Sequence, residues 1–394
     1  MELPQRGAED TCQEGVSSIG HSGLPPGDAD GREELNRISR RSAFAPLLNL
    51  PAGSFAFIMA TGIVSLAAIP LGHDNIAAAL FALNLLAFPL LCVFLLVRLN
   101  QHLLGVLSEL CDHRTAPGVL TVVAAASILG DQFVLFASNH QVAAALWIGS
   151  LVLCIGLVYA FFVSMTIRRV KPSLALELDG SWLLTVVATQ AIAILATHIS
   201  GVFSRPDIVV FVALCFFLLG GVFYLTVIWL IVQRWLFELM PPEQLTPSYW
   251  INMGAAAITT LAGERLLSVL DVNPLTAVLA RFIEAMTVLF WAIATWWIPL
   301  LVTLLVWRHI VHRIRPSFRL EYWSMVFPLG MYTAATSALS RQDGAQFLAG
   351  IPRLSFWIAL TSWLLGFVGM MRHLWRLRGG GQRNWTHADA ETSL

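Results

Sequence analysis

Hydrophobic positions along this chain gather into ten stretches that are almost free of charged residues. A helix needs about 20 apolar residues to cross the hydrocarbon core of a bilayer. The stretches lack the strict polar and apolar alternation of a membrane β-barrel, so we expect an all-α integral membrane protein. The predicted spans are 51–70, 75–97, 116–137, 141–167, 181–204, 207–233, 247–270, 276–307, 322–340 and 354–372.

Both ends of the chain have a different composition from the middle. Residues 1–43 are rich in Gly, Pro, Ser and charged side chains, with no apolar periodicity, which predicts a disordered tail. This stretch lacks the apolar core of a signal peptide directly after its start, so we expect no cleavage. The end of the chain, 376–394, contains three consecutive glycines and is predicted to be a second tail. The membrane domain is therefore expected to cover 44–375.

The odd-numbered spans begin at regular intervals of 65 to 73 residues. Two helices and two short loops fill such a period, which predicts five helical hairpins. The two members of a hairpin differ in bulk: nearly half of the residues in the odd-numbered spans are Ala, Gly, Ser or Thr, against about a quarter in the even-numbered spans. Small side chains let membrane helices approach closely, so we expect the odd-numbered helices to form an inner ring around a central pore.

The polar side chains of the odd-numbered spans are mostly hydroxyls and amides, which suit the lining of a conduit. The alternative is that these groups bond to their own helix or mediate packing. The candidates for lining are Ser54, Thr61, Ser65, Thr121, Ser127, Thr185, Thr189, Gln190, Asn252, Thr259, Thr260, Ser324, Thr333, Thr336 and Ser337.

Composition narrows the class of protein. Of the residues, 57% are hydrophobic and 12% are charged, about half the charged share of a soluble domain, which excludes a soluble enzyme or a nucleic-acid binder. The formal net charge is zero, yet nineteen of the 24 Lys and Arg fall on one side if both termini are cytoplasmic. This bias predicts an even number of spans in a plasma membrane with both termini inside.

Few ionisable residues fall within or near the spans, where they are costly and usually paired. Arg281 and Glu284 are three residues apart and are expected to form an ion pair, with Glu264 and Arg265 in a clamp between the seventh and eighth helices. Asp131 has no cation near it in sequence, so it is our candidate for proton coupling.

The sequence carries no sign of an enzyme, a metal centre or a bound cofactor. It contains no HExxH, GxSxG or P-loop motif, and the five cysteines are scattered without CxxC spacing. We therefore expect no catalysis, cofactor or metal. A membrane receptor or embedded enzyme without a transport role stays open as an alternative, because apolar helices do not specify flux.

Four stretches at the starts of odd-numbered spans resemble the tellurite-resistance/C4-dicarboxylate transporter family, which includes malate permeases, sulfite exporters and plant slow anion channels. The similarity covers roughly 45–375. The stretches are PAGSFAFIMATGIVS at 51–65, SWLLTVVATQ at 181–190, YWINMGA at 249–255 and WSMVFPLGMYT at 323–333.

The resemblance implies a quasi-fivefold subunit, an inner ring around a pore, a homotrimer and an aromatic gate at Phe327 on the ninth helix. The alternative for Phe327 is lateral packing beside Pro328. The implied solutes are small anions, either C4-dicarboxylates such as malate or inorganic anions. A proton-coupled carrier and a sulfite- or tellurite-related exporter stay open, and we expect lipid but no nucleic acid as a further partner.

Overall fold

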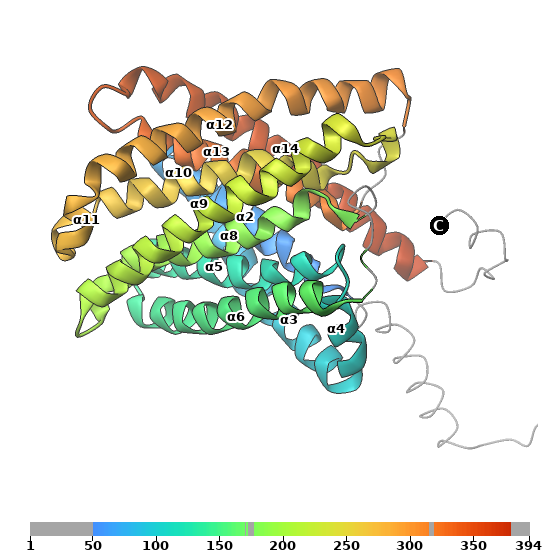
Figure 1. Ribbon diagram of the computed structural model, residues 1–394, viewed down its shortest axis with the longest axis horizontal. Coiled ribbons are helices and arrows are strands. Elements are labelled where there is room, and N and C mark those ends of the chain that lie inside the picture. Colours follow the sequence, from blue (N-terminus) through green and yellow to red (C-terminus); the bar gives the residue numbers. More distant parts are fainter. Residues whose placement is uncertain (1–49, 170, 172–176, 315–318, 380–394) are drawn as a thin grey trace, which may run out of the picture. The chain divides into compact units, whose positions relative to one another are not determined.

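The computed structural model describes residues 50–169, 171, 177–314 and 319–379. Its described part is helical throughout and contains no strand. The predicted tail at 1–43 and most of the predicted tail at 376–394 lie outside the described residues. Each apolar stretch found in the sequence carries a helix (Figure 1).

Five short helices alternate along the chain with five long ones. Each short helix continues a 3-10 turn that precedes it, and each is buried along most of its length. The short helices with their leading turns are η1(Ala52–Phe55) with α2(Ala56–Ala68), η3(Ala116–Leu120) with α5(Thr121–Ala137), η4(Gly180–Leu183) with α8(Leu184–Ile199), η7(Pro247–Trp250) with α10(Ile251–Leu267), and η10(Leu320–Tyr322) with α13(Trp323–Leu339).

The long helices expose many large apolar side chains, as helices that face lipid tails do. Their starts follow local signals: the Asn139 side chain accepts a hydrogen bond from the Val142 N–H before α6, and Pro206 begins α9. Gly72 takes the left-handed conformation in the turn that leads into α3. The long helices are α3(Asp74–Gln101), α6(His140–Ile167), α9(Pro206–Phe237), α12(Ala280–Val306) and α14(Gly350–Gly379).

Two shorter helices were not predicted from the sequence. α4(Leu103–Leu110) follows α3 after a break at His102, whose backbone leaves the helical region. α11(Pro274–Val278), capped by the Asn273 side chain, separates the start of the predicted span 276–307 from α12. A π turn, η9(Trp307–Val311), follows α12.

Within the described part of the chain, eight helices, counted with their flanking turns, are long and apolar enough to cross a membrane; α10 and α13 are not among these eight. Both of these helices are rich in small and hydroxyl-bearing residues and are buried among the others. A helix that other helices surround need not be strongly apolar itself. Length and composition therefore support a helical membrane protein with at least eight candidate spans.

Candidate functional site

The five short helices close into a ring. Going round it, α2 packs on α5, α5 on α8, α8 on α10, α10 on α13, and α13 on α2. Their leading 3-10 turns make a second closed circuit, in which η1, η3, η4, η7 and η10 contact one another in order and η10 contacts α2. All five helices therefore start at the same end, which we call the N-terminal mouth. The opposite end, where they finish, is the C-terminal mouth.

Close contacts on α13 identify its neighbours on either side. A Cβ at Gly254 of α10 would lie 2.7 Å from Cγ of Pro328, so Pro328 faces α10. A Cβ at Gly330 would lie 2.9 Å from Cγ2 of Ile63, so Gly330 faces α2. Successive residues of a helix are rotated by about 100°, so Pro328 and Gly330 lie on two different sides of α13. Of the two faces that remain, one points toward the long helices and the other toward the ring interior.

Hydrogen bonds show which face of α13 points outward. The Thr333 hydroxyl donates to Ser355 Oγ of α14 at 2.9 Å, and Trp291 Nε1 of α12 donates to Thr336 Oγ1 at 3.0 Å. Phe327 lies on the opposite side of the helix from these two threonines. The phenyl ring therefore belongs to the face of α13 that points into the ring.

Exposure along this inward face is lowest at Phe327. Phe327 is 0% exposed and Met331 is 1% exposed, whereas Ser324 on the N-terminal side is partly exposed. Toward the C-terminal mouth, exposure rises to 9% at Ala334 and further at Ala338. The inward face of α13 is thus accessible from both ends and closed between them.

The same reasoning orients α5. A Cβ at Gly130 would lie 2.5 Å from Cδ2 of Leu195 on α8, and the Thr121 hydroxyl donates to the Ala52 carbonyl on the α2 side. The rings of Phe133 and Phe136 pack on Phe81 of α3, so that face points outward. The face that remains carries two polar residues, Ser127 and Asp131.

Most of the hydroxyl and amide candidates for pore lining bond elsewhere. Ser65 donates to the Ala77 carbonyl of α3, Gln190 Nε2 to the Phe217 carbonyl of α9, and Thr61 accepts from Trp363 Nε1 of α14. With Thr333 and Thr336, these residues link the ring to the long helices. The hydroxyls that bond within their own helix or its leading turn belong to Thr121, Thr185, Thr189, Thr259 and Thr260.

A smaller group of candidates makes no such bond. The Ser54 and Ser127 hydroxyls and both amide atoms of Asn252 are buried without a hydrogen-bond partner among the described residues. The Asn252 backbone carbonyl accepts from Tyr224 Oη of α9. Ser324 and Ser337 likewise have no side-chain hydrogen bond among the described residues. Ser127 and Ser324 are the candidates that combine a hydroxyl without a hydrogen-bond partner among the described residues with a position on an inward face.

Thr61→Val tests whether Thr61 links α2 to α14 or lines the proposed path of the solute. The substitution leaves Trp363 Nε1 buried without its acceptor, so we expect a loss of about 1 kcal/mol in unfolding free energy, seen as a lower thermal midpoint. Thr226→Val is the control, because Thr226 is exposed on α9 and bonds only to the Val222 carbonyl of its own helix. A changed solute flux with unaltered stability would instead make Thr61 part of the lining.

Ionisable side chains meet at the C-terminal mouth. Asp131 Oδ1 of α5 lies 2.7 Å from His198 Nδ1 of α8, although 67 residues separate them in sequence. Arg265 of α10 lies within electrostatic reach of Asp131, Glu264 and Arg341. These residues gather charge at one end of a ring whose inward face on α13 is apolar from Phe327 to Ala338.

The expected clamp between α10 and α12 is only partly formed: among the described residues, Arg281 and Glu284 make an ion pair and Glu264 and Arg265 do not. Arg281 Nη1 lies 3.0 Å from Glu284 Oε2, and the arginine side chain is 93% exposed. Glu264 and Arg265 are not in ion-pair contact with either residue among the described residues. Glu284 acts on Glu264 only at longer range.

A buried arginine at the N-terminal mouth was missed by sequence analysis, which treated it as one of many topology-setting cations. Arg234 of α9 is 4% exposed, and it donates to the Leu178 carbonyl, to Tyr249 Oη and to Gln244 Oε1. These bonds tie the long helix α9 to the segments before η4 and η7. The signal in the sequence was weak, because its partners lie up to 56 residues away.

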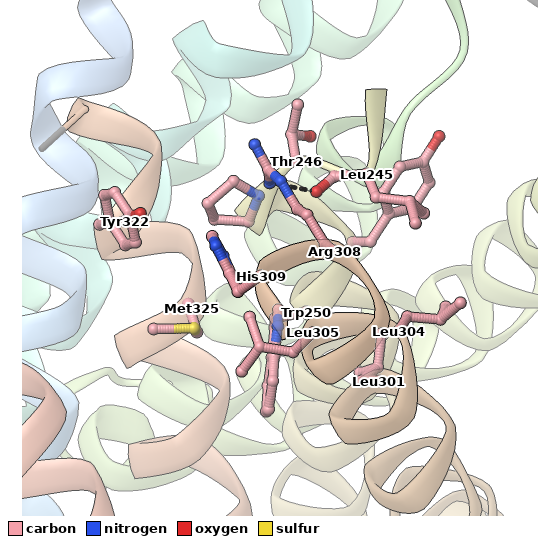
Figure 2. Close-up of a pocket in the computed structure, with 12 residues that line it drawn as sticks. Leu245, Thr246, Trp250, Leu301, Leu304, Leu305, Arg308, His309, Tyr322 and Met325 are labelled. Atoms are coloured by element: carbon pink, nitrogen blue, oxygen red, sulfur yellow. Dashed lines mark hydrogen bonds between the residues drawn. The ribbon is translucent and has the colours of Figure 1, made fainter. Parts of the chain in front are cut away.

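A small pocket lies beside the N-terminal mouth, outside the ring, between η7, the end of α12 and the start of α13 (Figure 2). Arg308 and His309 line its polar side, and the Arg308 guanidinium donates to the Leu245 carbonyl. Trp250 and Leu305 form part of its apolar wall. Its volume of about 30 Å³ holds about two waters, too little for an organic anion, so this pocket does not rival the ring as a solute site.

The arrangement defines a class: a helical membrane protein with a ring of buried helices inside a layer of lipid-facing ones. Comparison with known proteins gives the family. The chain matches the family described as "SLAC1: Voltage-dependent anion channel" over residues 49–371, and it belongs to that family. The family is one of anion transporters and channels, which supports anion transport as the general function and favours a non-enzyme.

Named relatives agree with a membrane transporter. "Uncharacterized membrane protein Rv1735c" of Mycobacterium tuberculosis (strain ATCC 25618 / H37Rv) is 38% identical over 151 residues, which cover 38% of this chain and 76% of the relative. "Uncharacterized transporter MJ0762" of Methanocaldococcus jannaschii is 22% identical over 334 residues, or 81% of this chain and 93% of the relative. The second match extends along most of both chains.

Proposed function

We propose that the ring of α2, α5, α8, α10 and α13 is a conduit for small anions, closed at Phe327. The observation that carries this proposal is the inward face of α13, which is partly accessible toward both mouths and sealed at Phe327 and Met331. An aromatic side chain on the axis of a helix ring is a simple gate, because the ring obstructs solute and water alike. The solutes proposed are C4-dicarboxylates such as malate, or inorganic anions.

The proposal includes all ten helices as membrane spans in a quasi-fivefold arrangement. The closed circuit of helix contacts and the regular 65 to 73 residue spacing support this. The excess of arginine in the segments on the side of the N-terminal mouth supports a cytoplasmic position for that mouth in a plasma membrane. A homotrimer with one conduit in each subunit is proposed on the resemblance to the family.

Flux through purified protein tests the proposed function. The full chain is reconstituted in liposomes, and the uptake of chloride, nitrate, sulfite and malate is compared with uptake by protein-free liposomes. We expect anion uptake that a membrane potential drives in the direction set by the charge. Absence of flux for the whole panel, with folded protein in the bilayer, would remove transport and leave the receptor as the alternative.

The ion pair at the C-terminal mouth supports a second candidate, a proton-coupled carrier. Asp131 and His198, two ionisable side chains on neighbouring helices of the ring, share a hydrogen bond of 2.7 Å. Such a pair is able to take up and release a proton within the path of a solute. The channel and the carrier differ in whether solute uptake depends on a proton gradient.

Asp131→Asn distinguishes the two. If the pair couples protons to transport, the variant should lose most of the dependence of uptake on external pH, because the asparagine side chain does not ionise. Uptake is measured in proteoliposomes with and without an imposed pH gradient. Glu284→Gln, which breaks an exposed ion pair on α12, is the control. An unchanged pH profile in the Asp131 variant would favour the channel.

A further inference from the structure

We propose that Arg265 is an anion-binding residue at the C-terminal mouth, where its guanidinium holds a planar oxyanion group, such as a nitrate or one carboxylate, as it enters or leaves the ring. This inference rests on the proposed function and specifies one of its sites. It gives Arg265 a role different from the structural clamp that sequence analysis predicts.

The position of Arg265 points toward the ring interior. Arg265 lies on the last turn of α10, whose ring neighbours are α8 and α13. Asp131 lies within electrostatic reach of Arg265, although Asp131 is on α5, which is not a ring neighbour of α10. α5 and α10 lie on the two sides of α8 in the ring, so an interaction between Asp131 and Arg265 reaches across the C-terminal mouth. Both side chains therefore belong to the space at the end of the ring.

The guanidinium of Arg265 has no partner of its own. Among the described residues, it joins no hydrogen bond and no ion pair, and its Nε is buried without an acceptor. Asp131 is already engaged by His198, and Glu264, the next residue in the chain, is not within ion-pair distance. A partly buried cation without a partner is costly, and an anion at this position removes the cost.

The shape and charge of the site favour certain anions. Arginine presents parallel N–H donors that fit the two oxygens of a carboxylate or nitrate, whereas a spherical chloride uses this geometry less well. The other charged groups within electrostatic reach of the guanidinium are two acids, Asp131 and Glu264, and one cation, Arg341. The site should therefore bind a planar oxyanion such as formate more tightly than chloride.

The first test compares variants in proteoliposomes with formate and chloride as probes. Arg265→Gln should raise the concentration of formate that gives half-maximal uptake by about tenfold or more, as expected when charge-assisted hydrogen bonds are lost. Arg265→Lys keeps the positive charge but removes the planar pair of donors, so it should lose the preference for formate over chloride. Arg281→Gln, on the exposed surface of α12, is the matched control and should change neither.

The second test needs no transport. Formate should raise the thermal midpoint of the purified protein, because a ligand that binds only the folded state stabilises it, and Arg265→Gln should abolish that increase. A formate-dependent midpoint that requires Arg265, in protein without flux, would support the site and reject the proposed conduit. Wild-type half-saturation and a wild-type midpoint shift in Arg265→Gln, or an undiminished formate preference in Arg265→Lys, would overturn the inference.

Discussion

Replacing Phe327 with alanine is expected to raise passive anion flux through the reconstituted protein by at least about tenfold. The phenyl ring is fully buried on the inward face of α13, and its removal leaves space for several methylene groups on the axis of the proposed conduit. Met331, the next residue on the same face, is unchanged in this variant. Leucine fills part of the space left by the phenyl ring, so Phe327→Leu should give an intermediate flux. The measurement is anion efflux from loaded liposomes, or conductance across a planar bilayer.

Phe290→Ala is the control for this experiment. Phe290 is equally buried, but it lies on the long helix α12 and packs against Tyr224 of α9. Its loss should lower stability by an amount similar to that for Phe327, about 3 to 5 kcal/mol, without opening a path for anions. Equal flux in wild type and Phe327→Ala, with both proteins folded, would mean that Phe327 packs laterally beside Pro328.

Gly180→Ala is expected to lower the stability of the protein strongly. A Cβ at Gly180 would lie 2.5 Å from the Ser248 carbonyl carbon and 2.7 Å from Tyr249 Cα, and closer still to the Ser248 carbonyl oxygen. These are backbone atoms of η7, so a rotamer change offers no relief. We expect a loss of about 3 kcal/mol or more in unfolding free energy, at the upper end for overpacking, because η4 and η7 must separate. The thermal midpoint of the purified protein measures it.

Gly149→Ala provides the comparison. A Cβ at Gly149 meets no atom within 4 Å, and the residue lies within α6, where alanine is the better helix former. Its midpoint should be unchanged or slightly higher. A wild-type midpoint in Gly180→Ala would show that the packing of η4 on η7 does not hold the N-terminal mouth together.

Much of the architecture is predictable from hydropathy. The runs of apolar residues locate the helices, and the small side chains of alternate runs predict which helices are buried. α4 and α11 were not predicted because they are short, at eight and five residues, and neither forms a distinct charge-free stretch. Helix ends such as that of α14, seven residues beyond the predicted 372, depend on packing and not on hydropathy alone.

The rotation of each helix about its own axis was not predictable in this way. Hydroxyl groups suit both a lining and a bond to a neighbouring helix, and the sequence alone does not choose between these uses. The structure turns Ser65, Gln190 and Thr333 toward the long helices. What orients α13 is the fit of Pro328 on Gly254, which requires knowing that α10 is its neighbour. The Asp131 and His198 pair depends likewise on the order of helices in the ring.

The common starting end of the five ring helices makes the proposed conduit electrically polar. Each helix carries a partial positive charge at its N-terminus and a partial negative charge at its C-terminus, and in parallel helices these charges add. An anion is therefore attracted to the N-terminal mouth and repelled at the other. Arg265, on the last turn of α10, places a positive charge at this negative end. In the proposed conduit, this charge offsets part of the repulsion that the parallel arrangement of helices creates.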